Sequence, residues 1–207
     1  MSETPYPIFT IGHSTHWLET FIALLKQHDI TVVADVRSAP YSRFAPQFNK
    51  KSLEHRLKVN GIRYVFLGRE LGARSEDRTC YENGRVEYQR LAKTDLFRDG
   101  IERIIRGANS YRIALMCAEK EPLECHRTLL VGRELVEHGL QVAHILADGR
   151  LESHDDSMER LLDAVGLPHK DLFRSREELI SEAMIRQEER VAYVDEGMVS
   201  DSGREMQ

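Results

Sequence analysis

Five short apolar segments alternate with helix-like segments along the first 147 residues, and this alternation restricts the chain to a small set of folds. The apolar segments cover residues 6–11, 30–36, 62–67, 112–116 and 141–146. Their nearly continuous apolar character is typical of parallel strands that are buried on both faces. Between them, apolar residues recur at helical spacing, as in residues 17–25 and 125–138. The pattern predicts a three-layer α/β fold with a mostly parallel five-stranded sheet.

The pattern changes after residue 149, where no further apolar strand follows. Residues 1–147 hold 21 Lys and Arg against 18 Asp and Glu, whereas residues 148–207 hold 8 against 16. Ser175 and Glu178 fit a capping box, which predicts that a long charged helix begins there. We therefore expect an α/β domain at residues 1–149, with a pocket at its strand ends. Residues 150–207 are expected to form an acidic helical C-terminal extension with a loose tail.

Composition excludes several classes of protein. The longest apolar runs are far shorter than the roughly 20 residues of a membrane span, and no secretory signal pattern is visible at the N-terminus. Three cysteines, an odd number, favour free thiols in a reducing compartment. The basic residues do not form the strong stripe expected of a general nucleic-acid binder. We expect a cytoplasmic protein without membrane contact. The sequence is compatible with a homodimer.

Polar or ionisable side chains follow four of the five expected strands directly. The carboxyl ends of parallel strands meet at one edge of a sheet, so these side chains should share a pocket there. The candidates are His13, Ser14, Asp35, Arg37, Arg69, Glu70, Cys117, Glu119 and Lys120.

A second group, Cys125, His126 and Arg127, stands where a helix is expected to begin. Unpaired amides and the helix dipole favour an anion at such a place and lower the pKa of a thiol there. The group could therefore bind a phosphate-like anion or present a reactive thiolate. In the plainer alternative, Cys125 only caps the helix and Arg127 pairs with a nearby carboxylate.

These residues lead to a hypothesis about roles. Cys117 or Cys125 would be the nucleophile, and His13 or Glu119 would move protons. Arg37 and Arg127 would hold the anion, with the remaining candidates as further ligand contacts. Cys117 could equally be a small core residue.

Metal binding is a further alternative for Cys117, Cys125 and His126. Seven residues between the two cysteines is not a usual zinc spacing, however. We therefore expect neither a metal nor another cofactor.

Several stretches together resemble a known family of unknown function, domain-of-unknown-function family 488. The resemblance covers about residues 8–147, and its motifs are residues 10–14, 35–38, 46–49, 61–64, 70–72, 117–120 and 125–127. It implies the α/β fold and the positions of the pocket, but no reaction. A weaker similarity connects the chain with rhodanese-like domains, in which a strand ends in Asp-Val-Arg and a later strand ends in a catalytic cysteine. The loop after Cys117 is longer and more acidic than in that pattern.

Three functions are compatible with this pattern. The first is an enzyme, a hydrolase or transferase, that binds an anionic small molecule or nucleotide. The second is a non-catalytic nucleotide or nucleic-acid binding module, in which Arg43, Lys50, Lys51 and Arg56 contact the phosphate backbone. The third is a structural protein whose acidic C-terminal helices bind a partner.

Overall fold

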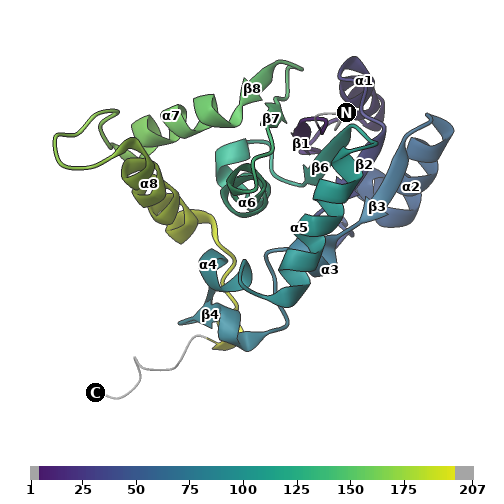
Figure 1. Ribbon diagram of the computed structural model, residues 1–207. Coiled ribbons are helices and arrows are strands. Elements are labelled where there is room, and N and C mark those ends of the chain that lie inside the picture. Colours follow the sequence, from purple (N-terminus) through teal and green to yellow (C-terminus); the bar gives the residue numbers. More distant parts are fainter. Residues whose placement is uncertain (1–4, 199–207) are drawn as a thin grey trace.

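The computed structural model describes residues 5–198, and its centre is a six-stranded sheet with the order β3-β2-β6-β1-β7-β8 (Figure 1). Neighbouring strands are parallel from β3 to β7, as predicted. These five strands are β1 (Ile8–Gly12), β2 (Val32–Asp35), β3 (Arg63–Phe66), β6 (Ile113–Cys117) and β7 (Val142–Ile145). A sixth strand that was not predicted, β8 (Leu151–Ser153), runs antiparallel to β7 at the edge.

Helices cover both faces of this sheet, which gives the predicted three layers (Figure 1). Alternate strand residues point to opposite faces, so Phe9 and Val33 belong to one core and Ile8 and Val32 to the other. The first core is closed by α1 (Leu18–Gln27) and α2 (Lys50–Val59). The second is closed by α5 (Asp95–Ala108) and by η4 (Arg127–Gly132), a π-helical segment that continues into α6 (Arg133–Glu137).

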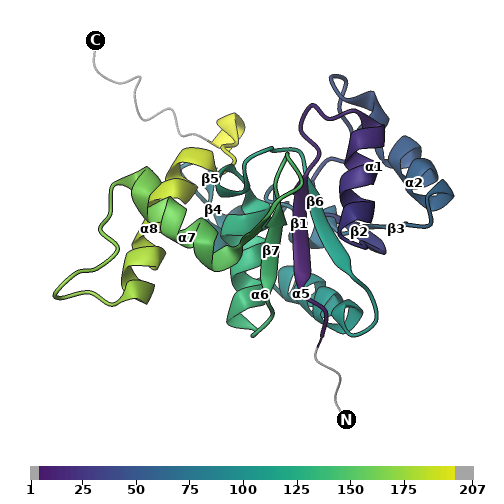
Figure 2. The same cartoon turned by 90° about the horizontal axis from the view of Figure 1, so that it is seen from above.

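The C-terminal residues form two helices that pack against each other beyond β7 (Figure 2). They are α7 (His154–Val165) and α8 (Arg176–Val191). The predicted capping box at Ser175 and Glu178 is present at the start of α8. After α8 the chain returns to the body of the protein, where the backbone N–H of Val86 donates to the carbonyl of Tyr193.

The segment 73–85 is mostly polar, but part of it has regular structure. It contains the short helical turn η2 (Arg78–Cys80) and strand β4 (Tyr81–Glu82), which pairs with β5 (Arg85–Val86). The remaining short elements are η1 (Pro46–Phe48), α3 (Gly68–Leu71), α4 (Tyr88–Leu91), η3 (Pro122–Glu124) and η5 (Glu196–Met198). Within residues 5–198, no helix combines the length and the apolar character needed to cross a bilayer.

Candidate functional site

The candidate site lies at the carboxyl edge of the sheet, where β1 and β6 end side by side. Gly12, the last residue of β1, pairs in register with Cys117, the last residue of β6. The loop after Cys117 then folds closely over the end of β1. A Cβ atom at Gly12 would lie 1.9 Å from the carbonyl oxygen of Glu119, so only glycine allows this approach. The loop returns at Cys125, beside the strand end from which it started.

Three buried donors meet at this point, and we call Cys117, Cys125 and His126 the cysteine cluster. Nδ1 of His126 lies 3.7 Å from the Sγ atom of Cys117 and 3.8 Å from that of Cys125. All three donor atoms lie within 4.8 Å of one another. The fold therefore brings together a strand end and a helix start that are separated by seven residues in the sequence.

The orientation of the His126 ring is fixed by the backbone of the second strand. Nε2 lies 3.0 Å from the carbonyl oxygen of Val36, and a carbonyl can only accept, so Nε2 carries a hydrogen. Nδ1 is therefore the nitrogen that faces both sulfur atoms. Burial lowers the pKa of His126, but the hydrogen bond and charge of Cys125 outweigh burial and raise it.

A buried arginine supplies positive charge next to the cluster. Arg127 is fully buried, and its Nη1 and Nη2 atoms donate to the carbonyls of Glu119 and Lys120 at 2.7 and 3.2 Å. Among residues 5–198, no carboxylate oxygen lies within 4.0 Å of this guanidinium, which is always charged. A buried charge needs compensation, and the Cys125 thiol is a neighbour that can provide it as a thiolate.

The two thiols of the cluster respond to this environment in opposite directions. Burial raises the pKa of Cys125, but the hydrogen bond from Cys117 and the positive charges of Arg127 and His126 outweigh burial and lower it well below its usual value. Burial and the interaction with Cys125 raise the pKa of Cys117. The Sγ atom of Cys125 also accepts the Arg127 backbone N–H at 3.4 Å. Cys125 therefore accepts a backbone hydrogen bond just before the helix and is also the more acidic thiol.

A buried ion pair lies at the end of β2, the strand beside β6. Nε and Nη2 of Arg37 donate to the two carboxylate oxygens of Asp35 at 2.9 and 2.7 Å, and the Tyr64 hydroxyl donates to Asp35 at 2.7 Å. Nη1 of Arg37 lies 3.1 Å from Nε2 of His13, whose ring is stacked on Phe48. Burial and the charge of Arg37 lower the pKa of His13 to about 4. His13 is therefore neutral at pH 7 and holds Arg37 in place.

A cavity of about 360 Å³ opens onto the cluster. Of the predicted site residues, it is lined by Arg37, Cys117, Glu119, Cys125 and His126. Three further lining residues, Arg74, Tyr88 and Tyr193, were not among the predicted site residues. The Arg74 guanidinium lies over the Tyr193 ring, 4.5 Å from its centroid. Arg74 stands in the polar segment 73–85, whereas Tyr193 reaches the cavity only because the chain returns after α8.

Comparison with known proteins shows which family the chain belongs to. The model of the family described as "Domain of unknown function DUF488" matches residues 17–133, more than half of the chain. The chain belongs to this family. Searches of curated proteins and of solved structures found no match. The DUF488 match includes the whole cysteine cluster, Arg127 and the Asp35–Arg37 pair, but it ends before α7 and α8.

Some predicted site residues of the DUF488 segment lie away from the cavity. Arg69 and Glu70 line a separate pocket, and Glu70 pairs with Arg103. They are displaced because α3 begins directly after β3 and carries them away from the sheet edge. Ser14, just before the DUF488 match, and Lys120 are joined to the site through their backbones. The Ser14 N–H donates to the carbonyl of Ala118, and the Lys120 carbonyl accepts from Arg127.

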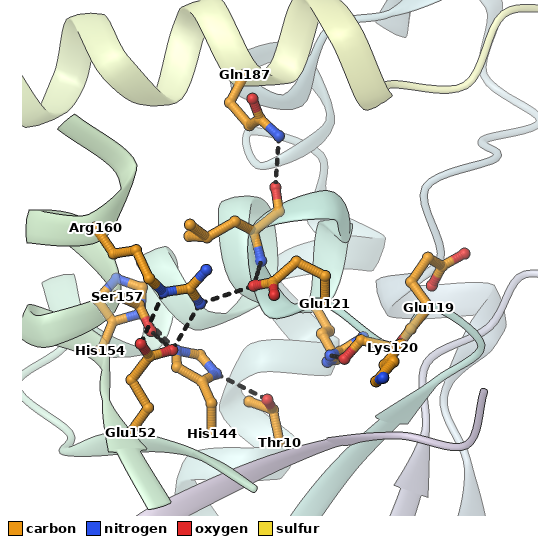
Figure 3. A network of polar contacts seen from close by, with 12 residues as sticks. Thr10, Glu119, Lys120, Glu121, His144, Glu152, His154, Ser157, Arg160 and Gln187 are labelled. Carbon is orange, nitrogen blue, oxygen red and sulfur yellow. Dashed lines mark hydrogen bonds and ion pairs between the residues drawn. The ribbon is translucent and has the colours of Figure 1, made fainter. Parts of the chain in front are cut away.

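The C-terminal helices outside the DUF488 match fix the loop that carries Glu119 and Cys125 (Figure 3). Nη2 of Arg160, on α7, lies 2.7 Å from Glu121 and 2.8 Å from Glu152. The Glu121 carboxylate in turn accepts the Leu123 backbone N–H, and Gln187 of α8 donates to the Leu123 carbonyl at 3.0 Å. The position of the loop therefore depends on residues far along the chain.

Two more buried histidines lie beneath this network (Figure 3). Nδ1 of His144 lies 2.8 Å from the Thr10 hydroxyl, and Nε2 lies 3.3 Å from Nδ1 of His154. Burial, followed by the charges of His154 and Arg127, lowers the pKa of His144 well below its usual value. Burial also lowers the pKa of His154. Both rings therefore take up a proton less readily in the folded protein than in the unfolded chain.

This pair predicts a loss of stability in mild acid. Below about pH 6.5 the unfolded chain takes up protons that the folded chain does not, so the free energy of unfolding falls, by up to about 1.4 kcal/mol per pH unit for each histidine. Urea unfolding between pH 7.5 and 5 should therefore show a shallower decline for His154→Gln than for the wild type. His55→Gln, an exposed change on α2, is the matched control. Equal declines for His154→Gln and the wild type would contradict the prediction.

Proposed function

We propose that the chain is an enzyme, a transferase or hydrolase, in which Cys125 attacks a substrate that carries an anionic group and binds in the cavity. One observation carries this proposal: Cys125 lines the cavity and has a carboxyl group and an imidazole close to its Sγ atom. It lies 3.0 Å from Oε2 of Glu119 and 3.8 Å from Nδ1 of His126. A thiol between a base and a proton donor is the usual arrangement for nucleophilic catalysis.

The chemical roles follow from these contacts. His126 takes the thiol proton, and the Sγ atom forms a bond to the electrophilic atom of the substrate while the bond to the leaving group breaks. Glu119 gives its proton to the leaving group, since burial and the charge of Cys125 raise the pKa of its carboxyl group. Water or an acceptor molecule then displaces the thiol and restores the proton to Glu119.

Arg37 and Arg74 would hold the anionic group of the substrate. Both arginines line the cavity, and Arg37 keeps one Nη1 hydrogen beyond its bonds to Asp35, Phe48 and His13. Arg127 was expected to contact the anion directly, but we assign it a different role. Its Nη1 and Nη2 atoms hold the loop carbonyls, so it contributes charge to the thiol and not a contact to the substrate.

Alkylation kinetics test this proposal. In buffer with a chelator at pH 6.5, iodoacetamide should modify Cys125 at least about tenfold faster than Cys80, a buried free cysteine outside the cluster. Mass spectrometry of peptides assigns each site. Inorganic phosphate should slow the reaction at Cys125, and Arg74→Ala should remove this protection. Equally slow labelling of all three cysteines, unaffected by phosphate, would refute the proposal.

A nucleic-acid function is favoured by one surface feature. Arg43 is exposed between Tyr41 and Phe44, whose exposed fractions are 69% and 97%, and exposed aromatic rings beside basic groups can stack on bases. Under this alternative, a single-stranded oligonucleotide would protect Cys125 where phosphate does not. That protection would weaken steeply as salt is added.

A further inference from the structure

We infer that Cys117, Cys125 and His126 bind a thiophilic divalent cation, zinc in the first place, with a fourth coordination position open to the cavity. The inference goes beyond the proposed reaction and does not rest on it, because it needs no substrate and no catalysis. With the ion bound, Cys125 and His126 are ligands, so the proposed attack by Cys125 belongs to the metal-free chain. It also reverses the expectation from sequence spacing that no metal is bound.

The distances within the cluster are those of an assembled site. Zinc binds cysteine sulfur at about 2.3 Å and histidine nitrogen at about 2.0–2.1 Å in a tetrahedral arrangement, so the sulfur and nitrogen ligands of one ion lie about 3.6 Å apart. In this protein Nδ1 of His126 lies 3.7 Å from one sulfur and 3.8 Å from the other. Both nitrogen–sulfur distances are close to the value expected for ligands of one zinc ion, although the donors come from separate elements.

The surroundings of His126 support the same inference. A histidine that binds a metal usually donates its other ring N–H to a carbonyl or carboxylate, which fixes the ring and directs the free nitrogen at the ion. Nε2 of His126 makes this contact with the Val36 carbonyl at 3.0 Å. Val36 follows β2 directly, so the rigid sheet sets the direction of Nδ1.

The donor set selects the kind of ion. Two sulfur ligands and one imidazole suit zinc and similar cations, whereas magnesium and calcium prefer oxygen. Two thiolates also balance the charge of a divalent ion, which makes its burial less costly. Glu119 contacts Cys125 but is not among the three residues whose donor atoms converge. Three protein ligands beside a cavity correspond to a zinc site with a position left for water or substrate.

Cobalt titration of the tag-free, chelator-treated full-length chain tests this inference. We expect one equivalent of Co²⁺ to bind and to produce the thiolate charge-transfer band and strong visible bands of tetrahedral cobalt. Zinc should abolish these bands by displacement. Cys117→Ser and His126→Asn should each weaken binding by at least about 100-fold. Cys80→Ser, which removes a buried thiol outside the cluster, should leave binding unchanged.

The wild-type spectrum requires no variant, so the test remains decisive even where a variant fails to fold. Absence of a thiolate band in the folded wild-type protein would overturn the inference, as would an undiminished cobalt affinity in folded Cys117→Ser. The result is separate from the alkylation result. A chain that binds metal but shows no fast thiol after chelation refutes only the proposed reaction, and a fast thiol without cobalt binding refutes only the metal site.

Discussion

Asp35→Ala is expected to lower the free energy of unfolding by about 3–5 kcal/mol, the cost of leaving one partner of a buried ion pair without the other. For a chain of this length, such a loss corresponds to a fall of roughly 6–20 °C in the melting temperature. Thermal and urea unfolding measure it directly. The effect should be among the largest of any single substitution at the site.

The physical reason is the number of donors that depend on one carboxylate. Asp35 has an exposed fraction of 0% and accepts the backbone N–H, Nε and Nη2 of Arg37 and the hydroxyl of Tyr64. Removal of the carboxylate leaves the Arg37 guanidinium, itself only 6% exposed, without its counter-charge. Arg37 lines the cavity, so anion binding should weaken together with stability.

The matched control is an ion pair of the same type at the surface. Glu19 and Arg56 lie 2.9 Å apart, but their side chains are 71% and 48% exposed. Glu19→Ala should cost no more than about 1 kcal/mol. The double variant Asp35→Leu/Arg37→Met should recover part of the stability lost in Asp35→Ala, since it leaves no unpaired buried charge. If Asp35→Ala and Glu19→Ala unfold alike, the account of the ion pair is wrong.

The fold could be predicted where the signal was long and apolar. Four of the five parallel strands consist wholly of buried or partly buried residues, and the sequence shows them as apolar runs. In β3 the first residue, Arg63, is exposed and the other three are partly buried. Strand β8 has only three residues, of which two are exposed, so it carries no apolar signal. The two-residue strands β4 and β5 are shorter still. Such elements depend on the strands they pair with and not on their own composition.

The candidate site could be predicted as a place but not as a set of contacts. Strand ends and a helix start indicated where Cys117 and Cys125 would lie. That both sulfurs meet one imidazole nitrogen depends on how the loop folds back over Gly12, and spacing alone does not specify this path. The contacts of Arg127 could not be predicted either. Its charge suggested an anion ligand, whereas its partners are two loop carbonyls, which have no signature in the sequence.

Arg127→Met is expected to slow the alkylation of Cys125 by about tenfold or more at pH 7, since loss of each pKa unit of stabilisation lowers the thiolate fraction tenfold. Methionine keeps much of the volume of the side chain but removes the positive charge that opposes the effect of burial on the Cys125 pKa. The pKa should therefore rise, and the thiol should stay protonated at neutral pH. The carbonyls of Glu119 and Lys120 lose their donors as well, at about 1–3 kcal/mol for each one left buried and unpaired.

Arg133→Met distinguishes this electrostatic effect from a general change in the helix. Arg133 begins α6, directly after the segment that Arg127 starts, and pairs with Glu137 on a partly exposed surface. Its loss should leave both the alkylation rate and the pH dependence of that rate unchanged. In Arg127→Met, the pH at which the rate reaches half of its maximum should move upward while the limiting rate at high pH is kept. A uniform slowing at all pH values would instead mean that Arg127 only positions the loop, and the buried charge would then have no part in activating Cys125.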